Sequence, residues 1–204
     1  MNSWIITGGA GCGKSSVTEL LAHHLLKNKD LVFSADRSAQ ELLDDPAIQE
    51  ELLRSFGPSA LTQQDGRRLA DRGWLRAEVF SNPEKRRMLE QILHPGVLRA
   101  LELMRESRFN AGANVFLAEV PLHYEIGGTV SADLIIVVAA SPEVQKRRLM
   151  ERRGLDESII EQMLRAQWPI AAKVERADVV IWNDGDRNAL EAQVLTLARQ
   201  YWQA

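Results

Sequence analysis

The sequence lacks several features that would assign it to other protein classes. It has one cysteine, Cys12, so no internal disulfide can form. Its formal net charge of −3 gives no support to broad nucleic-acid binding. The longest apolar run, Leu134 to Ala140, is of strand length and falls short of the roughly 18 residues that a membrane span needs. The four histidines form no metal-ligand spacing, and the scattered tryptophans form no stacking platform.

The remaining composition is that of an ordinary globular chain. With 204 residues, 45% of them hydrophobic, the sequence is long enough for one well-buried core with a small added lobe. The first apolar run starts at about residue 4, which leaves no room for a signal or transit peptide. We therefore expect a cytoplasmic protein without nucleic-acid or membrane partners, acting as a monomer or weak homo-oligomer.

One glycine-rich stretch organises the chain. The segment Gly8 to Ser15 reads Gly-Gly-Ala-Gly-Cys-Gly-Lys-Ser, which matches the phosphate-binding pattern of Gly, four residues, and Gly-Lys-Ser/Thr. A short apolar run, Trp4–Thr7, precedes it, and apolar residues at helical spacing follow from Ser16 to Lys27. Strand, glycine-rich turn and helix form the context that a P-loop requires.

The chemistry of a P-loop explains this spacing. The glycines allow successive backbone N–H groups to point at phosphate oxygens, and the helix that follows directs its positive dipole end at the same anion. Lys14 reaches the β- and γ-phosphates, and the Ser15 hydroxyl binds Mg²⁺. A dinucleotide fingerprint fits less well, because Lys14 stands where its third glycine would be. The alternative is a glycine-rich turn without function.

The apolar runs predict an α/β fold. Five short buried strands alternate with helical segments, which indicates a P-loop NTPase-like, three-layer α/β/α architecture with a mainly parallel sheet. The expected strands are Trp4–Thr7, Leu31–Phe33, Val115–Val120, Leu134–Ala139 and Val179–Trp182. We expect a final helix from about Arg187 to Tyr201.

Two interruptions of this pattern are expected to bind substrates. Residues 44–108 read as a helical insertion, with helices over Ala47–Phe56 and Arg67–Phe80, a third from Pro83 to Leu93, a break at His94-Pro95, and a fourth to about Arg108. Residues 141–176 read as a small helical lid. We therefore treat 1–204 as one kinase-like domain, with a core at 1–43, 109–140 and 177–204.

Two acidic residues follow strand ends. Asp36 comes after the second strand and Glu119 ends the third, at the sheet edge where open α/β folds bind ligands. Asp36 would share a cleft with the P-loop, or instead act as the N-cap of a helix from Arg37. Glu119 would support Mg²⁺ through water, or be a structural partner of a helix or loop amide.

Two later segments offer groups for a nucleotide. The helix opened by Ser141-Pro142 carries five basic residues and ends at Gly154, a candidate C-cap and hinge. Arg148 and Arg152 share one face of it, where they could close over phosphates, although a basic helix is most often a solvated face. The turn with Asn183 and Gly185 either lies beside the adenine or simply ends its strand.

These segments together resemble the dephospho-CoA kinase family over nearly the whole chain. The matching residues are Thr7–Ser16, Ala35-Asp36, Arg72-Gly73-Trp74-Leu75, Val79–Pro83, Leu93-His94-Pro95, Glu119-Val120-Pro121-Leu122 with Glu125, Gln145 with Arg148 and Arg152, and Ala177-Asp178 with Asn183-Asp184-Gly185.

The resemblance implies transfer of the ATP γ-phosphoryl group, with Mg²⁺, to the 3′-hydroxyl of dephospho-CoA. It implies that Asp36 is the catalytic base and that Lys14 and Arg148 take part in catalysis. It also implies two sets of binding residues. ATP would be bound by Gly9, Ala10, Gly11, Cys12, Gly13, Lys14, Ser15, Ser16, Arg148, Arg152, Asn183 and Gly185. The acceptor would be bound by Asp36, Arg72, Leu75, His94, Pro95, Pro121, Leu122 and Glu125.

Some positions depart from the pattern of the family. Cys12 and Ser16 stand where Ser and Thr are common, and His123-Tyr124 replaces a commonly apolar pair. A thiol at a helix N-terminus can have a lowered pKa, which suggests that Cys12 is sensitive to oxidation.

The nearest rival function is a P-loop kinase for a nucleoside, nucleotide or sugar acid. A GTPase would need a guanine-reading Asn-Lys-x-Asp segment, which is missing, and a non-catalytic binding protein would not need Lys14 and Asp36.

Overall fold

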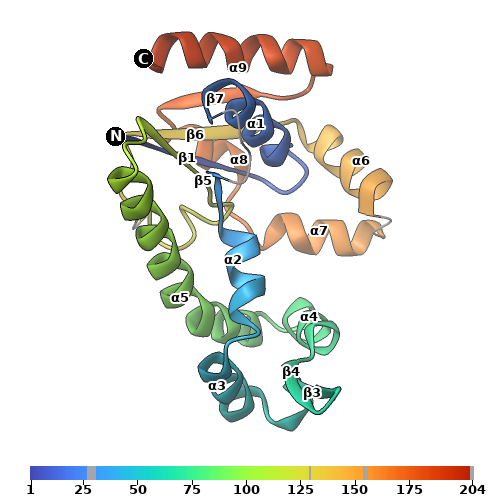
Figure 1. The fold of residues 1–204 in the computed structure, drawn as a ribbon. Coiled ribbons are helices and arrows are strands. Elements are labelled where there is room, and N and C mark those ends of the chain that lie inside the picture. Colours follow the sequence, from blue (N-terminus) through green and yellow to red (C-terminus); the bar gives the residue numbers. More distant parts are fainter. Residues whose placement is uncertain (27–30, 129, 154–155, 203–204) are drawn as a thin grey trace. The chain divides into compact units, whose positions relative to one another are not determined.

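The computed structural model describes residues 1–26, 31–128, 130–153 and 156–202 (Figure 1). The chain divides into two compact units. The first unit consists of Met1–Ser34 together with Arg105–Ala204, and the second consists of Ala35–Met104.

A five-stranded parallel sheet forms the centre of the first unit. Its strand order is β2-β5-β1-β6-β7, so β1, which leads into the P-loop, is the central strand. The strands are nearly all apolar because helices cover both faces of a parallel sheet. Their bounds are β1 Asn2–Gly8, β2 Phe33–Ser34, β5 Val115–Glu119, β6 Leu134–Ala139 and β7 Val179–Trp182. The expected fold class is confirmed, as are four of the strands, two of them to the residue, whereas the strand expected at Leu31–Phe33 is instead Phe33–Ser34.

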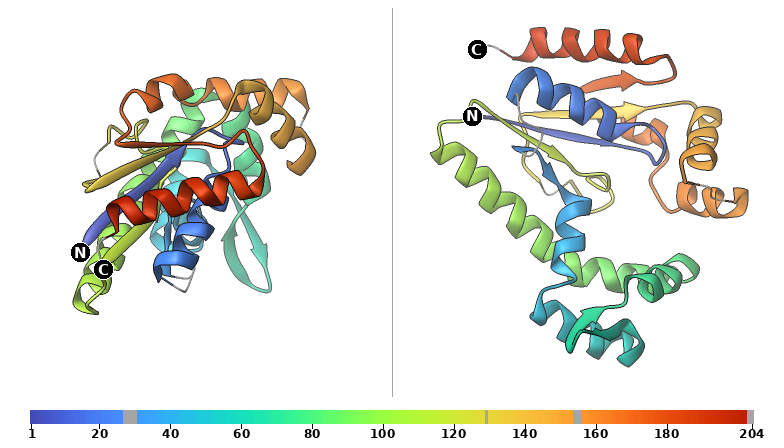
Figure 2. Two further views of the ribbon diagram at one scale, coloured as in Figure 1. Left: turned by 90° about the horizontal axis from the view of Figure 1, so that it is seen from above. Right: turned by 45° about the vertical axis from the view of Figure 1, so that its right-hand side comes forward.

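Helices cover the sheet on two sides, which gives the three layers. Helix α1 (Lys14–Leu21) continues as the π-helical turn η1 (Ala22–Leu26) and packs beside α9 (Arg187–Tyr201). Figure 2 (left) shows α1 in blue and α9 in red on one side of the sheet, with α8 (Ile170–Val174), in orange, on the other, where it contacts β6. Helices α6 (Pro142–Arg153) and α7 (Glu157–Arg165) lie beyond the ends of the strands, as Figure 1 shows. The expected stripe Leu190, Val194 and Leu197 lies in the core.

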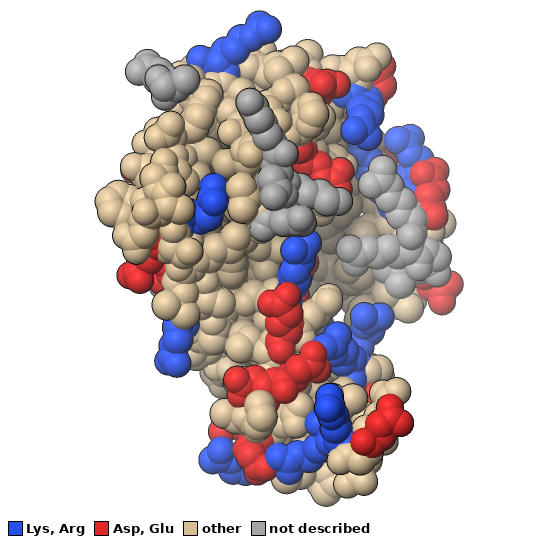
Figure 3. Space-filling model, viewed as in Figure 1, with Lys and Arg blue, Asp and Glu red and all other residues tan. Residues whose placement is uncertain are grey.

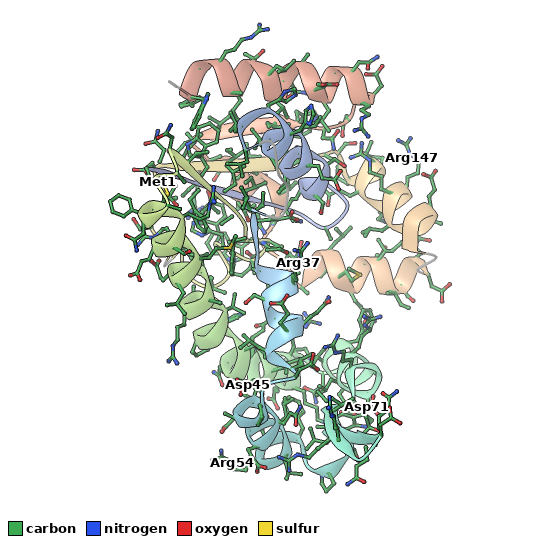
Figure 4. All side chains as sticks on the ribbon, in the orientation of Figure 1. Met1, Arg37, Asp45, Arg54, Asp71 and Arg147 are labelled. Atoms are coloured by element: carbon green, nitrogen blue, oxygen red, sulfur yellow. The ribbon has the colours of Figure 1, made fainter. Side chains whose placement is uncertain are left out.

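The second unit has its own small core. Its helices are α2 (Ala35–Leu42), α3 (Pro46–Phe56), the short 3₁₀ helix η3 (Pro58–Ala60), α4 (Arg72–Ser81) and most of α5 (Pro83–Asn110). Asp45 and Asp71, labelled in Figure 4, cap α3 and α4 by accepting hydrogen bonds from backbone N–H groups of the first turn. The core consists of Leu43, Leu52, Ala60, Ala70, Leu75 and Leu93, with partly buried side chains packed on it.

The insertion is not wholly helical, which corrects the sequence prediction. The helix expected at Arg67–Phe80 starts only at Arg72, because β3 (Leu61–Gln64) and β4 (Arg67–Ala70) form an antiparallel hairpin. Its two-residue turn is Asp65-Gly66, with φ of 51° and 74°. Asp-Gly with two positive φ angles is typical of a type I′ hairpin turn.

The expected break at His94-Pro95 is also wrong. Helix α5 runs without interruption through Pro95. Leu93, Val97 and Leu101, spaced four residues apart, are buried on both sides of the proline, so tertiary packing holds the helix together. Pro95 itself is exposed, so water can hydrogen-bond the backbone carbonyl that its missing N–H leaves unpaired.

The surface carries charges of both signs. On the face in Figure 3, blue basic and red acidic side chains are interspersed, as a net charge of −3 implies. None of the helices in the described part of the chain combines the length and apolarity that a bilayer crossing requires.

Candidate active site

The P-loop connects β1 to α1 as the spacing predicts. Gly13 is the N-cap of α1 and has a φ of 89°, a left-handed conformation that glycine adopts without strain. A Cβ there would lie 2.3 Å from Asn183 Nδ2. Gly8 has a φ of 143°, and a Cβ there would lie 2.1 Å from the Val138 carbonyl oxygen in β6. Both glycines are therefore needed for the path of the loop.

Lys14 folds back over the loop that it follows. Its Nζ donates to the carbonyl oxygens of Gly8 at 3.3 Å and Gly9 at 3.0 Å. The ammonium group thus lies at the β1 end of the loop, on the side where the loop begins. In this motif the lysine meets the β- and γ-phosphates, so this side corresponds to the outer end of a triphosphate.

Ser15 and Glu119 lie together, although they come from the first helix turn and the end of β5. Ser15 Oγ donates to Glu119 Oε1 at 3.1 Å. A hydroxyl and a carboxylate are the hard oxygen ligands that Mg²⁺ uses beside phosphate oxygens and water. These two residues therefore fit a Mg²⁺ held jointly with a nucleotide. Among the described residues, no group of three or more His, Cys, Asp or Glu side chains forms a separate metal cage.

A pocket of about 240 Å³ lies at the start of α1. It brings together several residues that the sequence singled out from distant segments. It is lined by Gly13, Ser16, Glu19, Leu20, Arg148, Asn183, Gly185, Asp186, Arg187 and Leu190. Arg148 also reaches the P-loop, with its guanidinium 3.5 Å from the carbonyl oxygen of Gly11. The pocket and the loop are thus continuous through Arg148 and Gly13.

Asn183 shapes the P-loop in addition to lining this pocket. Its side chain is buried, and Nδ2 donates to the Cys12 carbonyl oxygen at 2.9 Å. Its backbone N–H extends the sheet by donating to the Ala139 carbonyl oxygen. The adjacent Asp184 accepts from Ser141 N at 2.8 Å, at the start of α6. The turn therefore does more than end a strand: it fixes the loop and the basic helix relative to each other.

The basic helix α6 presents its arginines to different surroundings. Arg147 points into solvent, as Figure 4 shows, and its side chain is 61% exposed. Arg148 instead contacts the P-loop. The side chain of Arg152 and the expected hinge at Gly154 lie outside the described part of the structure. The solvated-face interpretation therefore holds for Arg147 and not for Arg148.

The burial of Cys12 contradicts the hypothesis that its thiol has a lowered pKa. The residue is fully buried within the P-loop. Burial raises the pKa of the Cys12 thiol, and the opposing effect of the Lys14 charge is smaller. Because the thiolate is the reactive form, a raised pKa and burial both argue against oxidation sensitivity.

We therefore expect Cys12 to react slowly with iodoacetamide at pH 7 in the folded protein. Its rate should be at least about tenfold below that of the same chain in denaturant, and it should still rise above pH 9, where an ordinary thiol is largely ionised. Mass spectrometry after timed quenching measures both rates. Native alkylation as fast as that of the denatured chain would restore the reactive-thiol hypothesis.

The loop after β5 is tied to the segment between α7 and α8. Glu125 Oε1 lies 2.7 Å from Lys173 Nζ and accepts from Trp168 N at 2.9 Å. The Lys173 side chain is wholly buried and that of Glu125 is 14% exposed. Lys173 Nζ also donates to the Pro121 carbonyl oxygen, which accepts from Thr7 Oγ1 as well. Glu125 thus has a structural role at one oxygen, while Oε2 is buried without a partner among the described residues.

The unusual pair His123-Tyr124 belongs to the same network. Tyr124 stacks on Trp168 with ring centroids 5.9 Å apart, and its hydroxyl donates to the Arg176 carbonyl oxygen. His123 is buried, and burial lowers the pKa of its imidazole. The Tyr124 hydroxyl therefore has a structural role in the first unit, whereas His123 Nδ1 is buried without a hydrogen-bond partner among the described residues.

The remaining expected acceptor residues are spread through the described chain. Asp36 is exposed in the first turn of α2, which begins at Ala35, so it is not the N-cap residue. Arg72 bonds the Asp44 carboxylate at 2.9 Å. Leu75 is 2% exposed and belongs to the core of the second unit, so packing accounts for it. His94 and Leu122 are half-buried, whereas Pro95 is exposed.

Sequence reasoning missed several residues that contact the P-loop, its pocket or the loop after β5. Gln167, Lys173 and Arg187 stand in no motif, and their spacing carries no signal. The side chain of Gln167 accepts a hydrogen bond from the Ala10 backbone. Arg187 lines the pocket, and Lys173 bonds Glu125 and the Pro121 carbonyl oxygen in the loop after β5.

Comparison with known proteins identifies the family. The family model described as dephospho-CoA kinase matches residues 4–189. The chain belongs to the dephospho-CoA kinase family. Membership in this family makes it an ATP-dependent phosphotransferase of coenzyme A biosynthesis whose acceptor is dephospho-CoA, as the sequence resemblance implied.

Individual proteins and solved structures are similar to this chain over nearly its full length. A dephospho-CoA kinase of Geobacillus kaustophilus is 35% identical over 197 residues, which cover 96% of this chain and 94% of the relative. The crystal structure of TT1252 from Thermus thermophilus is 31% identical with a TM-score of 0.76, covering 99% and 98% of the two chains. The dephospho-CoA kinase from Campylobacter jejuni is 26% identical with a TM-score of 0.61, covering 98% and 96%.

Proposed function

We propose that this chain transfers the γ-phosphoryl group of ATP to the ribose 3′-hydroxyl of dephospho-CoA, using Mg²⁺. The observation that carries the proposal is that Arg148 and Asn183, which line the pocket at the start of α1, both bond carbonyl oxygens of the P-loop. The loop amides, the α1 N-terminus and a basic side chain all face one place, which suits a triphosphate.

The P-loop and its neighbours would bind ATP. Backbone N–H groups from Gly9 to Ser16 would donate hydrogen bonds to the phosphate oxygens, Lys14 would neutralise the outer phosphates, and Arg148 would approach from α6. We assign the pocket with Asn183 and Gly185 to the nucleoside end, because it lies at the start of α1, opposite the Lys14 end of the loop. Arg152 would join Arg148, since the two are one turn apart.

Ser15 and Glu119 would hold Mg²⁺. The hydroxyl would be a direct ligand and the carboxylate would act directly or through water, since the two groups already lie within hydrogen-bond distance. When bound, Mg²⁺ would neutralise the negative charge that develops on the phosphates during transfer.

Asp36 would orient the acceptor hydroxyl and accept its proton. The residue stands two positions after Ser34, which pairs in the sheet with Glu119. Its carboxylate is exposed and therefore accessible to a substrate. We also assign the insertion 44–108 to acceptor binding, with Arg72, His94 and Pro95, and the loop residues Pro121, Leu122 and Glu125. Leu75 would act there only by supporting the fold, because it is buried.

Residues 141–176 would form the lid of the active site, and 1–43, 109–140 and 177–204 its core. Closure of such a lid over ATP would exclude water and limit wasteful hydrolysis. We further propose that the enzyme works in the cytoplasm as a monomer or weak homo-oligomer, with ATP and dephospho-CoA as its partners.

An acceptor panel tests this function. The purified protein receives ATP and Mg²⁺ with dephospho-CoA, adenosine, nucleoside monophosphates or gluconate, and acceptor-dependent ADP release is measured. We expect strong stimulation by dephospho-CoA alone. Stimulation only by another acceptor would instead identify a related small-molecule kinase.

A further inference from the structure

A glutamine that belongs to no motif accepts a hydrogen bond from one of the backbone N–H groups of the P-loop that would otherwise bind phosphate. Gln167 Oε1 accepts a hydrogen bond from Ala10 N at 2.8 Å, and the two residues are 157 positions apart in the chain. Gln167 lies between α7 and α8 and is half-buried. A carboxamide oxygen thus takes the place that a phosphate oxygen would occupy on this N–H.

The Ala10 amide lies at the outer end of the phosphate site. It follows Gly8 and Gly9, whose carbonyl oxygens hold the Lys14 ammonium. Because the lysine of this motif contacts the β- and γ-phosphates, the group nearest Ala10 N–H in the loaded site is the γ-phosphate. The α- and β-phosphates lie further along the loop, toward the N-terminus of α1.

The position of Gln167 is fixed by its neighbour. Trp168 N donates to Glu125 Oε1, the Trp168 ring stacks on Tyr124, and the Arg176 guanidinium lies 5.0 Å from the centroid of the same ring. Glu125 is held in turn by the buried Lys173. These contacts hold residue 167 beside the loop in this structure.

We propose that Gln167 binds the γ-phosphate of ATP and so distinguishes ATP from ADP. When a phosphate oxygen takes over the Ala10 N–H, the carbonyl oxygen of Gln167 would face another acceptor. Rotation of the carboxamide by half a turn about its last torsion, which is broad and roughly two-fold, presents Nε2 as a donor instead. Gln167 therefore accepts from the empty loop and donates to the loaded one. This inference deepens the proposed kinase function and rests on it.

The alternative is that Gln167 only holds the empty loop and competes with the nucleotide. The two roles make opposite predictions for Gln167→Ala. Loss of a donor to the γ-phosphate weakens ATP binding, whereas loss of a competitor strengthens it. ADP, which lacks the γ-phosphate, is little affected under our proposal.

Calorimetric titration of ATP and ADP, with Mg²⁺ and without acceptor, tests the proposal. We expect Gln167→Ala to weaken ATP binding by about 3- to 10-fold and to change ADP binding by less than about twofold. Gln167→Glu should weaken ATP binding by about 10- to 100-fold, because a carboxylate cannot donate and repels phosphate. Gln162→Glu, at an exposed position of α7, adds the same charge and should change neither affinity.

Tighter or unchanged ATP binding by Gln167→Ala would overturn the proposal, as would equal losses for ATP and ADP. Thermal unfolding of each variant checks that the fold is retained. Turnover of dephospho-CoA by the unsubstituted protein is measured in parallel. Its failure would count against the kinase function, while the ATP-to-ADP comparison would still test Gln167.

Discussion

Replacing Asp36 by asparagine is expected to lower turnover of dephospho-CoA by about 10²- to 10⁴-fold, the range for losing a positioned general base. The carboxamide keeps the size of the side chain and removes its ability to take a proton. ATP affinity should stay within about twofold, because the P-loop and Arg148 belong to other segments. Steady-state kinetics and ATP titration of the same preparation measure the two effects.

Asp65→Asn is the matched control for this variant. Asp65 is another exposed aspartate of the second unit, in the hairpin turn at a φ of 51°, a conformation that asparagine also accepts. Its turnover should equal that of the unsubstituted protein. Wild-type turnover in Asp36→Asn would show that Asp36 is not the base, whereas a parallel loss of ATP binding would indicate a structural role.

Replacing Lys173 by methionine is expected to lower the free energy of unfolding by about 3–5 kcal/mol. The substitution leaves the Glu125 carboxylate, only 14% exposed, without its cationic partner. It also removes the hydrogen bond to the Pro121 carbonyl oxygen. Urea unfolding followed by tryptophan fluorescence measures the loss.

Two further variants separate the buried pair from a general charge effect. In the double variant Lys173→Met with Glu125→Gln no charge is left unpaired, so it should recover a large part of the lost stability. Lys146→Met breaks an exposed pair with Glu161 and should cost about 0–1 kcal/mol. Similar losses for Lys173→Met and Lys146→Met would argue against a strong buried pair.

The strands and the P-loop could be predicted because their signals are local. Continuous apolar runs and the spacing from Gly8 to Ser15 lie within a few residues, and the parallel sheet follows from their alternation with helices. The hairpin at Asp65-Gly66 carried a local signal too, yet its polar strands, with Arg67 and Arg68, resemble an exposed helix. The proline rule failed at Pro95 because burial of its neighbours outweighs one lost hydrogen bond.

The site could be predicted only in part. The roles proposed for Lys14 and Ser15 follow from the motif, whereas the contacts of Gln167 with Ala10 and of Lys173 with Glu125 join segments far apart in the chain. Such contacts are set by tertiary packing, and one sequence carries no pattern for them. The same reason explains Cys12: its place at a helix N-terminus suggested a low pKa, and its burial in the fold reversed the direction.

The most direct test of the central claim is the identity of the product formed from dephospho-CoA. The protein is incubated with ATP, Mg²⁺ and dephospho-CoA, and the product is analysed by mass spectrometry and ³¹P NMR. Transfer by the P-loop site predicts one added phosphoryl group, as a monoester on the ribose 3′ oxygen, with one ADP per product. ADP without a phosphorylated product, or a phosphoryl group at another position, would contradict it.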